Sequence, residues 1–312
     1  MKNANIVILM ATFNGDKYLK DQIDSILRQT YSDWHLIIRD DGSTDNTISI
    51  LKSYQKTYPN KISVIVNNSN KHGAKENFFF LSRMALKEKY KYIMYSDQDD
   101  IWKKDKIDVT LKKFKEIEKD ENIPVLVHTD LEVVDNNLNV IASSFIKYSK
   151  LDNNDNFSHL LIQNNITGCT ILINRALLSK SLSIKNDKKI IMHDWWFAII
   201  ASVFGKIAFL NKSTILYRQH GDNVVGAKKI SLYNMSKKVF KFSENKLSVL
   251  QTINQASVLS DNYTNLPLKK EKVISGYSQI KSKNKIERIY FVKHNNILKN
   301  DLVRRLGEYI FI

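Results

Sequence analysis

Hydrophobic residues in the first third of the chain alternate between short continuous runs and segments with helical spacing. Continuous apolar runs are typical of strands buried on both faces of a sheet. They predict strands at residues 6–10, 36–38, 62–66 and 92–95. Apolar residues three or four positions apart predict helices near residues 18–27, 48–55 and 78–86. This alternation indicates right-handed βαβ units and an α/β fold, with a mostly parallel sheet flanked by helices.

The pattern changes after residue 103. A charged helix is expected at 104–119, and an apolar helix at 194–204 that ends with Gly205 as its C-cap. Further strands are predicted at residues 125–129, 138–148, 170–173, 208–210 and 214–218. Beyond Gly226, apolar residues recur at roughly helical intervals, which predicts a mainly helical C-terminal extension.

Charge divides the chain at the same place. The 312 residues include 48 Lys and Arg against 32 Asp and Glu, a net charge of +16 with a pI near 9.6. Residues 226–312 carry 17 basic and 6 acidic side chains, whereas residues 1–225 carry 31 and 26. We therefore expect a nearly balanced domain at 1–225 and a basic extension at 226–312.

Cysteine and hydropathy patterns narrow the class of protein. Cys169 is the single cysteine, which excludes an internal disulfide framework and a zinc site built from cysteines. We interpret it as a small buried hydrophobic residue. No apolar run reaches the roughly 18 residues of a membrane span, and the first residues lack a signal-peptide pattern. A cytoplasmic location is the expectation.

Acidic residues gather where two predicted strands end. Residues 40–45 follow the strand at 36–38, and residues 97–100 follow the strand at 92–95. Open α/β sheets bind ligands at the carboxyl ends of their strands. Crowded carboxylates repel one another unless a cation intervenes, and Mg²⁺ prefers oxygen ligands. The alternatives are an acidic turn with a helix N-cap for the first group, and chance for the second.

Two later groups carry further candidate chemistry. Asp194 opens an apolar helix beside two tryptophans, which suits either a general base in a partly dry pocket or an N-cap. His220 follows an apolar strand and is either a metal ligand, a phosphate contact or a structural residue. Arg218, on the same strand, could neutralise a leaving diphosphate.

The joint order of these motifs is more specific than any one of them. Asp-Asp-Gly-Ser, Ser-Asp-Gln-Asp-Asp, Thr-Gly-Cys, His-Asp-Trp-Trp and Tyr-Arg-Gln-His together resemble the family 2 glycosyltransferases over residues 6–226. Within that family the chain is most similar to bacterial rhamnosyltransferases of cell-wall and surface-polysaccharide assembly. The resemblance implies a GT-A fold and inverting, metal-dependent transfer from a nucleotide-sugar to an acceptor hydroxyl.

The resemblance also implies residue roles. Thr12, Phe13 and Asn14 would hold the base, with Asp41, Asn77, Asp97 and Gln98 as further nucleotide or donor contacts. Asp99 and His220 would hold Mg²⁺ or Mn²⁺, and Asp194 would be the catalytic base. Aromatic faces suit sugar rings, so Trp102, Trp195 and Trp196, with Arg218, are candidates for the sugar and acceptor pocket. Core packing is the alternative for the tryptophans.

Substrates are less closely defined. The expected donor is dTDP-rhamnose, with a UDP-hexose as the alternative. A lipid-linked oligosaccharide or glycan of a growing cell-surface polysaccharide is the expected acceptor. No Gln-x-x-Arg-Trp element is present, which favours addition of a single sugar over processive synthesis.

Two other classes of protein fit the sequence less well. The basic tail and interleaved aromatics would suit a nucleic-acid-binding protein, but not acidic clusters at three loops, so no nucleic-acid partner is expected. A nucleotidyltransferase would normally show a phosphate loop rich in Gly and Lys, which residues 12–16 lack. The tail could lie on an anionic membrane and make the chain a peripheral membrane protein. The basic residues that would contact such a membrane are Lys237, Lys238, Lys241 and Lys246. The alternative is a helical subdomain or subunit contact.

Overall fold

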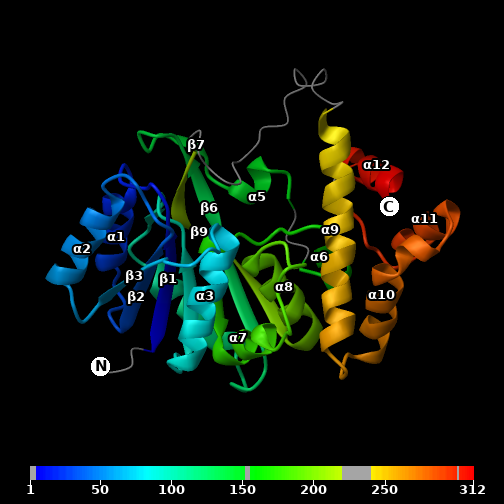
Figure 1. Ribbon diagram of the computed structural model, residues 1–312, viewed down its shortest axis with the longest axis horizontal. Helices are drawn as coiled ribbons and strands as arrows, with labels where there is room; N and C mark the ends of the chain where they lie inside the picture. Colours follow the sequence, from blue (N-terminus) through cyan, green and yellow to red (C-terminus); the bar gives the residue numbers. More distant parts are fainter. Residues whose placement is uncertain (1–4, 152–154, 220–239, 301) are drawn as a thin grey trace.

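The computed structural model describes residues 5–151, 155–219, 240–300 and 302–312 (Figure 1). Its strands are β1 Ile6–Thr12, β2 Trp34–Asp40, β3 Ile62–Val66, β4 Tyr92–Ser96, β5 Ile101–Trp102, β6 Val125–Val134, β7 Val140–Ala142, β8 Leu172–Asn174 and β9 Lys206–Arg218. Its α-helices are α1 Leu19–Leu27, α2 Thr47–Thr57, α3 Ala74–Lys87, α4 Lys106–Ile117, α5 Phe145–Tyr148, α6 Phe157–Leu160, α7 Arg175–Leu182, α8 His193–Phe204, α9 Phe240–Asn262, α10 Leu268–Ser278, α11 Lys285–His294 and α12 Leu302–Phe311.

One mixed sheet organises the described strands, in the order β3-β2-β1-β4-β8-β6-β9-β5, with β7 paired to β6. The first four strands of that order are parallel, which confirms the βαβ prediction. Beyond β4 the sheet is mixed, because β8 runs antiparallel to both β4 and β6. The carboxyl ends of β1, β2 and β4 therefore meet at one edge of the sheet.

Helices cover both faces of the sheet. Along β1, Val7 and Leu9 join a hydrophobic cluster with α3, α7 and α8, whereas Ile6, Ile8 and Met10 join another with α1, α2 and α4. Alternate residues of a strand point to opposite faces, so a strand covered on both sides reads as one apolar run. This is the expected three-layer α/β architecture.

Four of the predicted strands are corrected. Residues 138–148 do not form one strand: β7 is short, and Ser144 caps α5 by accepting a hydrogen bond from the backbone N–H of Lys147. Residues 170–173 divide between a 3-10 turn, η1 (Gly168–Thr170), and β8. The strands expected at 208–210 and 214–218 are one strand, β9, whose register with β6 shifts near Asp130.

The C-terminal helices form the part of Figure 1 farthest from α1 and α2, with α9 beside α8. They share a hydrophobic cluster with the sheet domain. Trp196 of α8 packs on Tyr263, which follows α9, with ring centroids 6.4 Å apart. The described helices include none with the length and apolar character needed to cross a bilayer. The helical run predicted around residues 232–239 lies outside the described residues.

Candidate functional site

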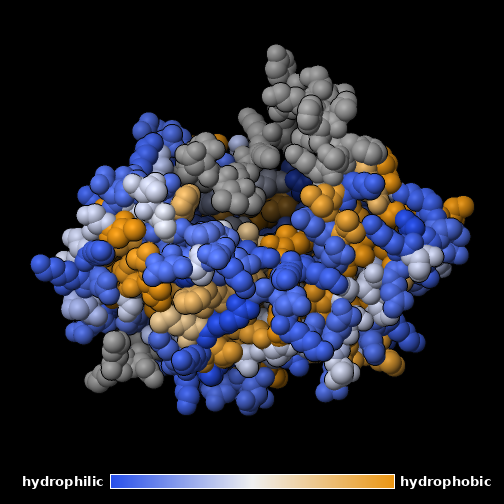
Figure 2. Space-filling view, in the orientation of Figure 1, coloured by the Kyte–Doolittle hydropathy of each residue, from blue (hydrophilic) through white to orange (hydrophobic). Residues whose placement is uncertain are grey.

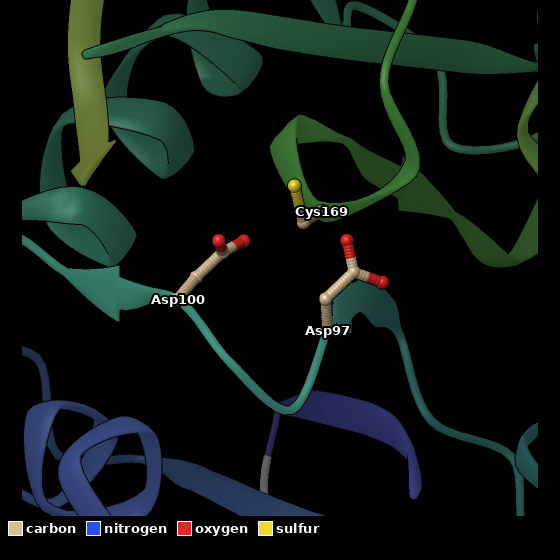
Figure 3. A group of neighbouring side chains, drawn as sticks. All are labelled: Asp97, Asp100 and Cys169. Carbon is tan, nitrogen blue, oxygen red and sulfur yellow. The ribbon is translucent and has the colours of Figure 1, made fainter. Parts of the chain in front are cut away.

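Two carboxylates and a thiol converge just beyond the end of β4. Asp97 and Asp100 lie in the loop between β4 and β5, and η1 brings Cys169 to them (Figure 3). One ligand atom from each side chain lies within 4.8 Å of the others. Figure 3 shows the three groups pointing into a common space. We call Asp97, Asp100 and Cys169 the acidic cluster.

Burial and mutual repulsion make the acidic cluster hard to ionise fully. Burial, with the nearby charge of Asp99, raises the pKa of Asp97 to about 7 and that of Asp100 well above its ordinary value. Burial and the two carboxylates also raise the pKa of the Cys169 thiol, which donates a hydrogen bond to Asp97. A cation placed among these groups would relieve the repulsion.

The donor set fits a divalent metal. Carboxylate oxygens suit Mg²⁺ and Mn²⁺, and the Oδ2 atom of Asp100 is buried without a hydrogen-bond partner among the described residues. Asp99 lies close enough to raise the pKa values of Asp97 and Asp100, and its role as a metal ligand stays a prediction. His220, the other expected ligand, lies outside the described residues.

Lys106 lies behind the acidic cluster at the start of α4. Its side chain is fully buried, and Nζ makes no hydrogen bond within the described structure. Nζ lies 4.7 Å from the ring centroid of Trp102. Burial lowers the pKa of Lys106 to about 8, while Cys169 and Asp100 oppose that shift. The lysine is a fixed counter-charge for the cluster.

Arg218 braces the loop that carries the acidic cluster. Its backbone N–H donates to Asp100, and its Nε donates to the carbonyl of Asp99 at 3.1 Å. The guanidinium also donates to the Asn136 carbonyl and to Asp21. The side chain is 3% exposed, and its expected place in the sugar pocket or at the diphosphate stays a prediction.

The expected base-binding loop is tied to the same loop by Gln98. The Phe13 N–H donates to Oε1 of Gln98 at 2.8 Å, and Nε2 of Gln98 donates to the Phe13 carbonyl at 3.0 Å. Gln98 therefore fixes the backbone of Phe13, whose ring is exposed. Asn14 joins this loop to the turn after β2, because its Oδ1 accepts from the backbone N–H of Thr44.

Asp41 lies in a second polar pocket, at the carboxyl end of β2. Its carboxylate accepts hydrogen bonds from the Gly73 N–H at 2.7 Å and from Asn67 at 2.6 Å. Burial opposes ionisation, yet these bonds and one from Asn77 hold the pKa of Asp41 below its usual range. Asn77 is itself buried and also accepts a hydrogen bond from Arg39, so it supports Asp41 from behind.

Thr12, the first of the expected base contacts, is also buried. Its hydroxyl donates to Asp40, the last residue of β2, at 2.9 Å. The structure therefore brings Thr12, Phe13, Asn14, Asp41 and Gln98 to one edge of the sheet. Of these residues, Phe13 and Asn14 are exposed, and the Phe13 side chain is 54% exposed.

Asp194 lies in the first turn of α8, next to the η1 turn that carries Cys169. Its carboxylate accepts hydrogen bonds from the N–H groups of Trp195 and Gly168 and from the side chain of Asn164. Burial nevertheless raises the pKa of Asp194 to about 6, and its charge in turn raises the pKa of Asp97. Met192, rather than Asp194, occupies the N-cap position of α8. The Asp194 carboxylate is therefore not the N-cap of this helix.

Of the three candidate tryptophans, two lie in the core and one lies beside Asp194. Trp196 is fully buried and donates from Nε1 to the carbonyl of Ser181 at 2.8 Å. Trp102 is 2% exposed and belongs to the cluster beneath α1 and α4. Both are core residues, which corrects their expected place in the sugar pocket. Trp195 is partly exposed, beside Asp194, and remains the candidate.

Sequence reasoning missed Cys169, which was interpreted as an ordinary buried residue, and gave no role to Lys106. The signal for Cys169 was its place in the Thr-Gly-Cys motif. The η1 turn serves two groups, because the Gly168 N–H donates to Asp194 while Cys169 donates to Asp97. Lys106 carried no comparable signal, since a lysine in a charged helix is usually solvated.

Comparison with known proteins identifies the chain's relatives. The dTDP-rhamnosyl transferase RfbG of Shigella flexneri is 34% identical over 233 residues, covering 70% of this chain and 74% of that protein. The Escherichia coli glucosyltransferase WfgD, named for UDP-Glc and a GlcNAc-diphosphoundecaprenol acceptor, is 27% identical. That alignment covers 56% of this chain and 62% of WfgD.

The fold has solved counterparts as well. The mannosyltransferase PcManGT of Pyrobaculum calidifontis, solved with GDP-Man and Mn²⁺, aligns with a TM-score of 0.54 at 12% identity. The alignment covers 94% of this chain and 73% of that one. The sequence profile of Glycosyl transferase family 2 matches residues 7–181, more than half of the chain. The chain therefore belongs to glycosyl transferase family 2 and is a nucleotide-sugar glycosyltransferase with a GT-A-like fold.

Proposed function

We propose that the enzyme adds a single sugar, with inversion, to an acceptor hydroxyl of a growing cell-surface polysaccharide. The observation that carries the proposal is Asp194, a buried carboxylate with a pKa of about 6 that lies close enough to the acidic cluster to raise the pKa of Asp97. A carboxylate in that range accepts a proton efficiently near neutral pH. A base beside a metal-binding loop suits activation of the acceptor hydroxyl next to the departing diphosphate.

The mechanism assigns separate tasks to the two sides of the site. Asp97, Asp99 and Asp100, with His220, would hold Mg²⁺ or Mn²⁺, which supplies charge stabilisation to the departing diphosphate. Phe13 and Asp41 hold the base, and Gln98 keeps their loop against the acidic cluster. Asp194 takes the proton from the acceptor hydroxyl as that oxygen attacks the anomeric carbon. Trp195 lines the acceptor side.

The proposed donor is dTDP-rhamnose. Support comes from the relative RfbG, which is named for this sugar nucleotide. A UDP-hexose is the second candidate, favoured by the name of WfgD. The WfgD name also supports a polyprenol-diphosphate-linked acceptor, which would place the enzyme at the inner face of a membrane as a peripheral protein.

A donor panel tests the substrate part of the proposal. Purified enzyme is given dTDP-rhamnose, UDP-glucose, UDP-galactose and UDP-N-acetylglucosamine with Mn²⁺, and release of the nucleoside diphosphate is measured. We expect the fastest turnover with dTDP-rhamnose and loss of turnover with a chelator. Preference for a UDP-sugar would replace the donor without removing the enzyme class.

Substitution of the proposed base tests the mechanism. Asp194→Asn preserves size but cannot accept the proton, so we expect transfer to fall by about 10²–10⁴-fold. The matched control is Asp105→Asn, because Asp105 is an exposed carboxylate paired with Lys212 outside the acidic cluster. Near-normal transfer by a folded Asp194→Asn enzyme would remove the assignment.

A further inference from the structure

The outer face of α12 exposes its largest aliphatic side chains. Leu302, Leu306 and Ile310 recur every four residues and are 75%, 62% and 58% exposed. A helix on the surface of a globular protein normally turns this stripe inward. Figure 2 shows apolar residues, in orange, at the surface over the C-terminal helices.

The inner face of α12 combines apolar packing by Tyr309 and Phe311 with buried polar contacts. Glu308 is 1% exposed and accepts a hydrogen bond from the Lys299 N–H at 3.0 Å. Burial raises the pKa of Glu308 to about 7. Arg305 donates to the Lys299 carbonyl at 2.6 Å, so the helix is anchored through polar contacts. The exposed stripe is therefore held outward by defined interactions.

A neighbouring helix extends this surface. Lys285, the first residue of α11, donates to the carbonyl of Ile310 at 2.7 Å, so the start of α11 adjoins the end of α12. Ile286 is next along α11 and is 82% exposed. Tyr290, one turn later, is also exposed and stacks on His294.

The charge around this apolar surface selects its partner. Residues 281–312 contain eight Lys and Arg against three Asp and Glu. One of those acids, Glu308, is buried. Exposed apolar side chains beside exposed Lys285 and Lys293 of α11 fit the interface of an anionic bilayer, where apolar burial and basic charge both favour binding.

A series of hydrogen bonds also connects α12 with Asp194, the proposed catalytic base. The backbone N–H of Asn300, two residues before α12, donates to Oε1 of Gln163 at 3.0 Å. Asn164, the next residue, donates to Asp194. Arg304 of α12 reaches the Ser149 carbonyl after α5. These contacts connect α12 with the segment that supports Asp194.

We propose that the outer face of α12, with the start of α11, docks the enzyme on the surface of an anionic phospholipid bilayer. The docking itself is independent of the sugar transferred. Its use, presenting a lipid-linked acceptor to Asp194, rests on the proposed function.

Vesicle co-sedimentation of the full chain tests the docking. The vesicles contain phosphatidylcholine alone or with about 30% phosphatidylglycerol. We expect binding to the anionic vesicles that weakens with salt, and a loss of at least about tenfold for Leu302→Ser/Leu306→Ser/Ile310→Ser. The matched control, Val140→Ser/Leu247→Ser/Leu268→Ser, removes three exposed aliphatic side chains elsewhere and should bind as the wild type does.

Several outcomes would overturn the docking proposal. They are no binding to anionic vesicles, equal binding to neutral ones, or unchanged binding by the α12 variant. A dimer that dissociates in the α12 variant, seen by light scattering, would assign the face to a second copy of the chain and equally overturn it. If the triple variant melts early, Leu306→Ser alone gives the same comparison with a smaller expected loss.

A catalytic readout separates this proposal from the proposed function. Donor hydrolysis needs no membrane, so the α12 variant should keep the wild-type rate. Transfer to an acceptor embedded in vesicles should fall with the binding. Vesicle binding by an enzyme with no transferase activity would leave docking intact and remove the proposed function instead.

Discussion

The carboxyl group of Asp194 combines burial with three hydrogen-bond donors, and the balance leaves its pKa near 6. Desolvation favours the protonated acid, while the Gly168 and Trp195 N–H groups and Asn164 favour the carboxylate. A base must be ionised to work. Activity should therefore be lost as the pH falls through the pKa of Asp194, and should be retained above it.

A pH profile measures this balance directly. At fixed free Mn²⁺, kcat/KM should rise about tenfold per pH unit below pH 6 and level off above it, because kcat/KM reports ionisation of the free enzyme. The Asp194→Asn variant should lose this limb of the profile. A flat wild-type profile from about pH 5 to 7, with the protein still folded, would contradict the assignment.

Gln98 gives a second prediction at this scale. Gln98→Ala removes both hydrogen bonds that hold the Phe13 backbone, so the base-binding loop loses its fixed position. We expect donor KM to rise about 30-fold, since two hydrogen bonds of about 1 kcal/mol each are lost. Gln98→Glu keeps the acceptor for the Phe13 N–H but loses the donor to the Phe13 carbonyl. Its donor KM should therefore lie between those of the wild type and Gln98→Ala. An unchanged KM for both variants would show that the loop is positioned by other contacts.

At the scale of elements, the junction of α8 and β9 depends on Gly205. A Cβ at this position would lie 1.8 Å from the carbonyl oxygen of Pro124. Gly205 was expected as a C-cap, and it is one, but its φ of −155° shows that close approach rather than a left-handed backbone requires glycine.

A pair of substitutions tests this requirement. Gly205→Ala must displace the Pro124 backbone and should lower the free energy of unfolding by at least about 1–3 kcal/mol. Gly307→Ala, within α12, meets nothing within 4 Å and should raise it by about 0.5–1 kcal/mol. Both effects are measured by denaturant titration. A neutral Gly205→Ala would mean that this junction relaxes easily.

Elements with one clear local signal were predictable, and those decided by distant contacts were not. The run at 6–10 is apolar throughout, so β1 could be read directly. The stretch 138–148 is also rich in apolar residues, yet Asp130 accepts hydrogen bonds from the Ser144 hydroxyl and the Phe145 N–H and turns it into α5. In the site, motif order located Asp97 and Asp194. The roles of Arg218 and Cys169 depend on partners far along the chain.

For the molecule as a whole, α8 joins the sheet domain to the C-terminal helices. Nine residues of α8 are buried, on all sides of the helix, so it needs cover from both directions. Part of that cover comes from the region of α9, including Ile253 and Tyr263. The basic extension thus contributes to the core around Trp196 as well as to the surface.

Truncation tests how far the two parts depend on each other. A chain ending at residue 239 would expose Trp196 and its neighbours in α8, at a cost of several kcal/mol. We expect its melting temperature to drop by at least about 10 °C, because each kcal/mol shifts it by about 2–4 °C in a chain of this size. A truncated chain that melts like the full one would show that residues 1–225 fold as an independent domain.

The two hydrogen bonds between Gln98 and the Phe13 backbone have a consequence for the order of events in a catalytic cycle. These bonds tie the loop that would read the base to the loop that would hold the metal. Filling either one should therefore reduce the disorder left to remove at the other, so we expect the two ligands to bind cooperatively. By thermodynamic reciprocity, nucleotide must strengthen metal binding by the same factor that metal strengthens nucleotide binding.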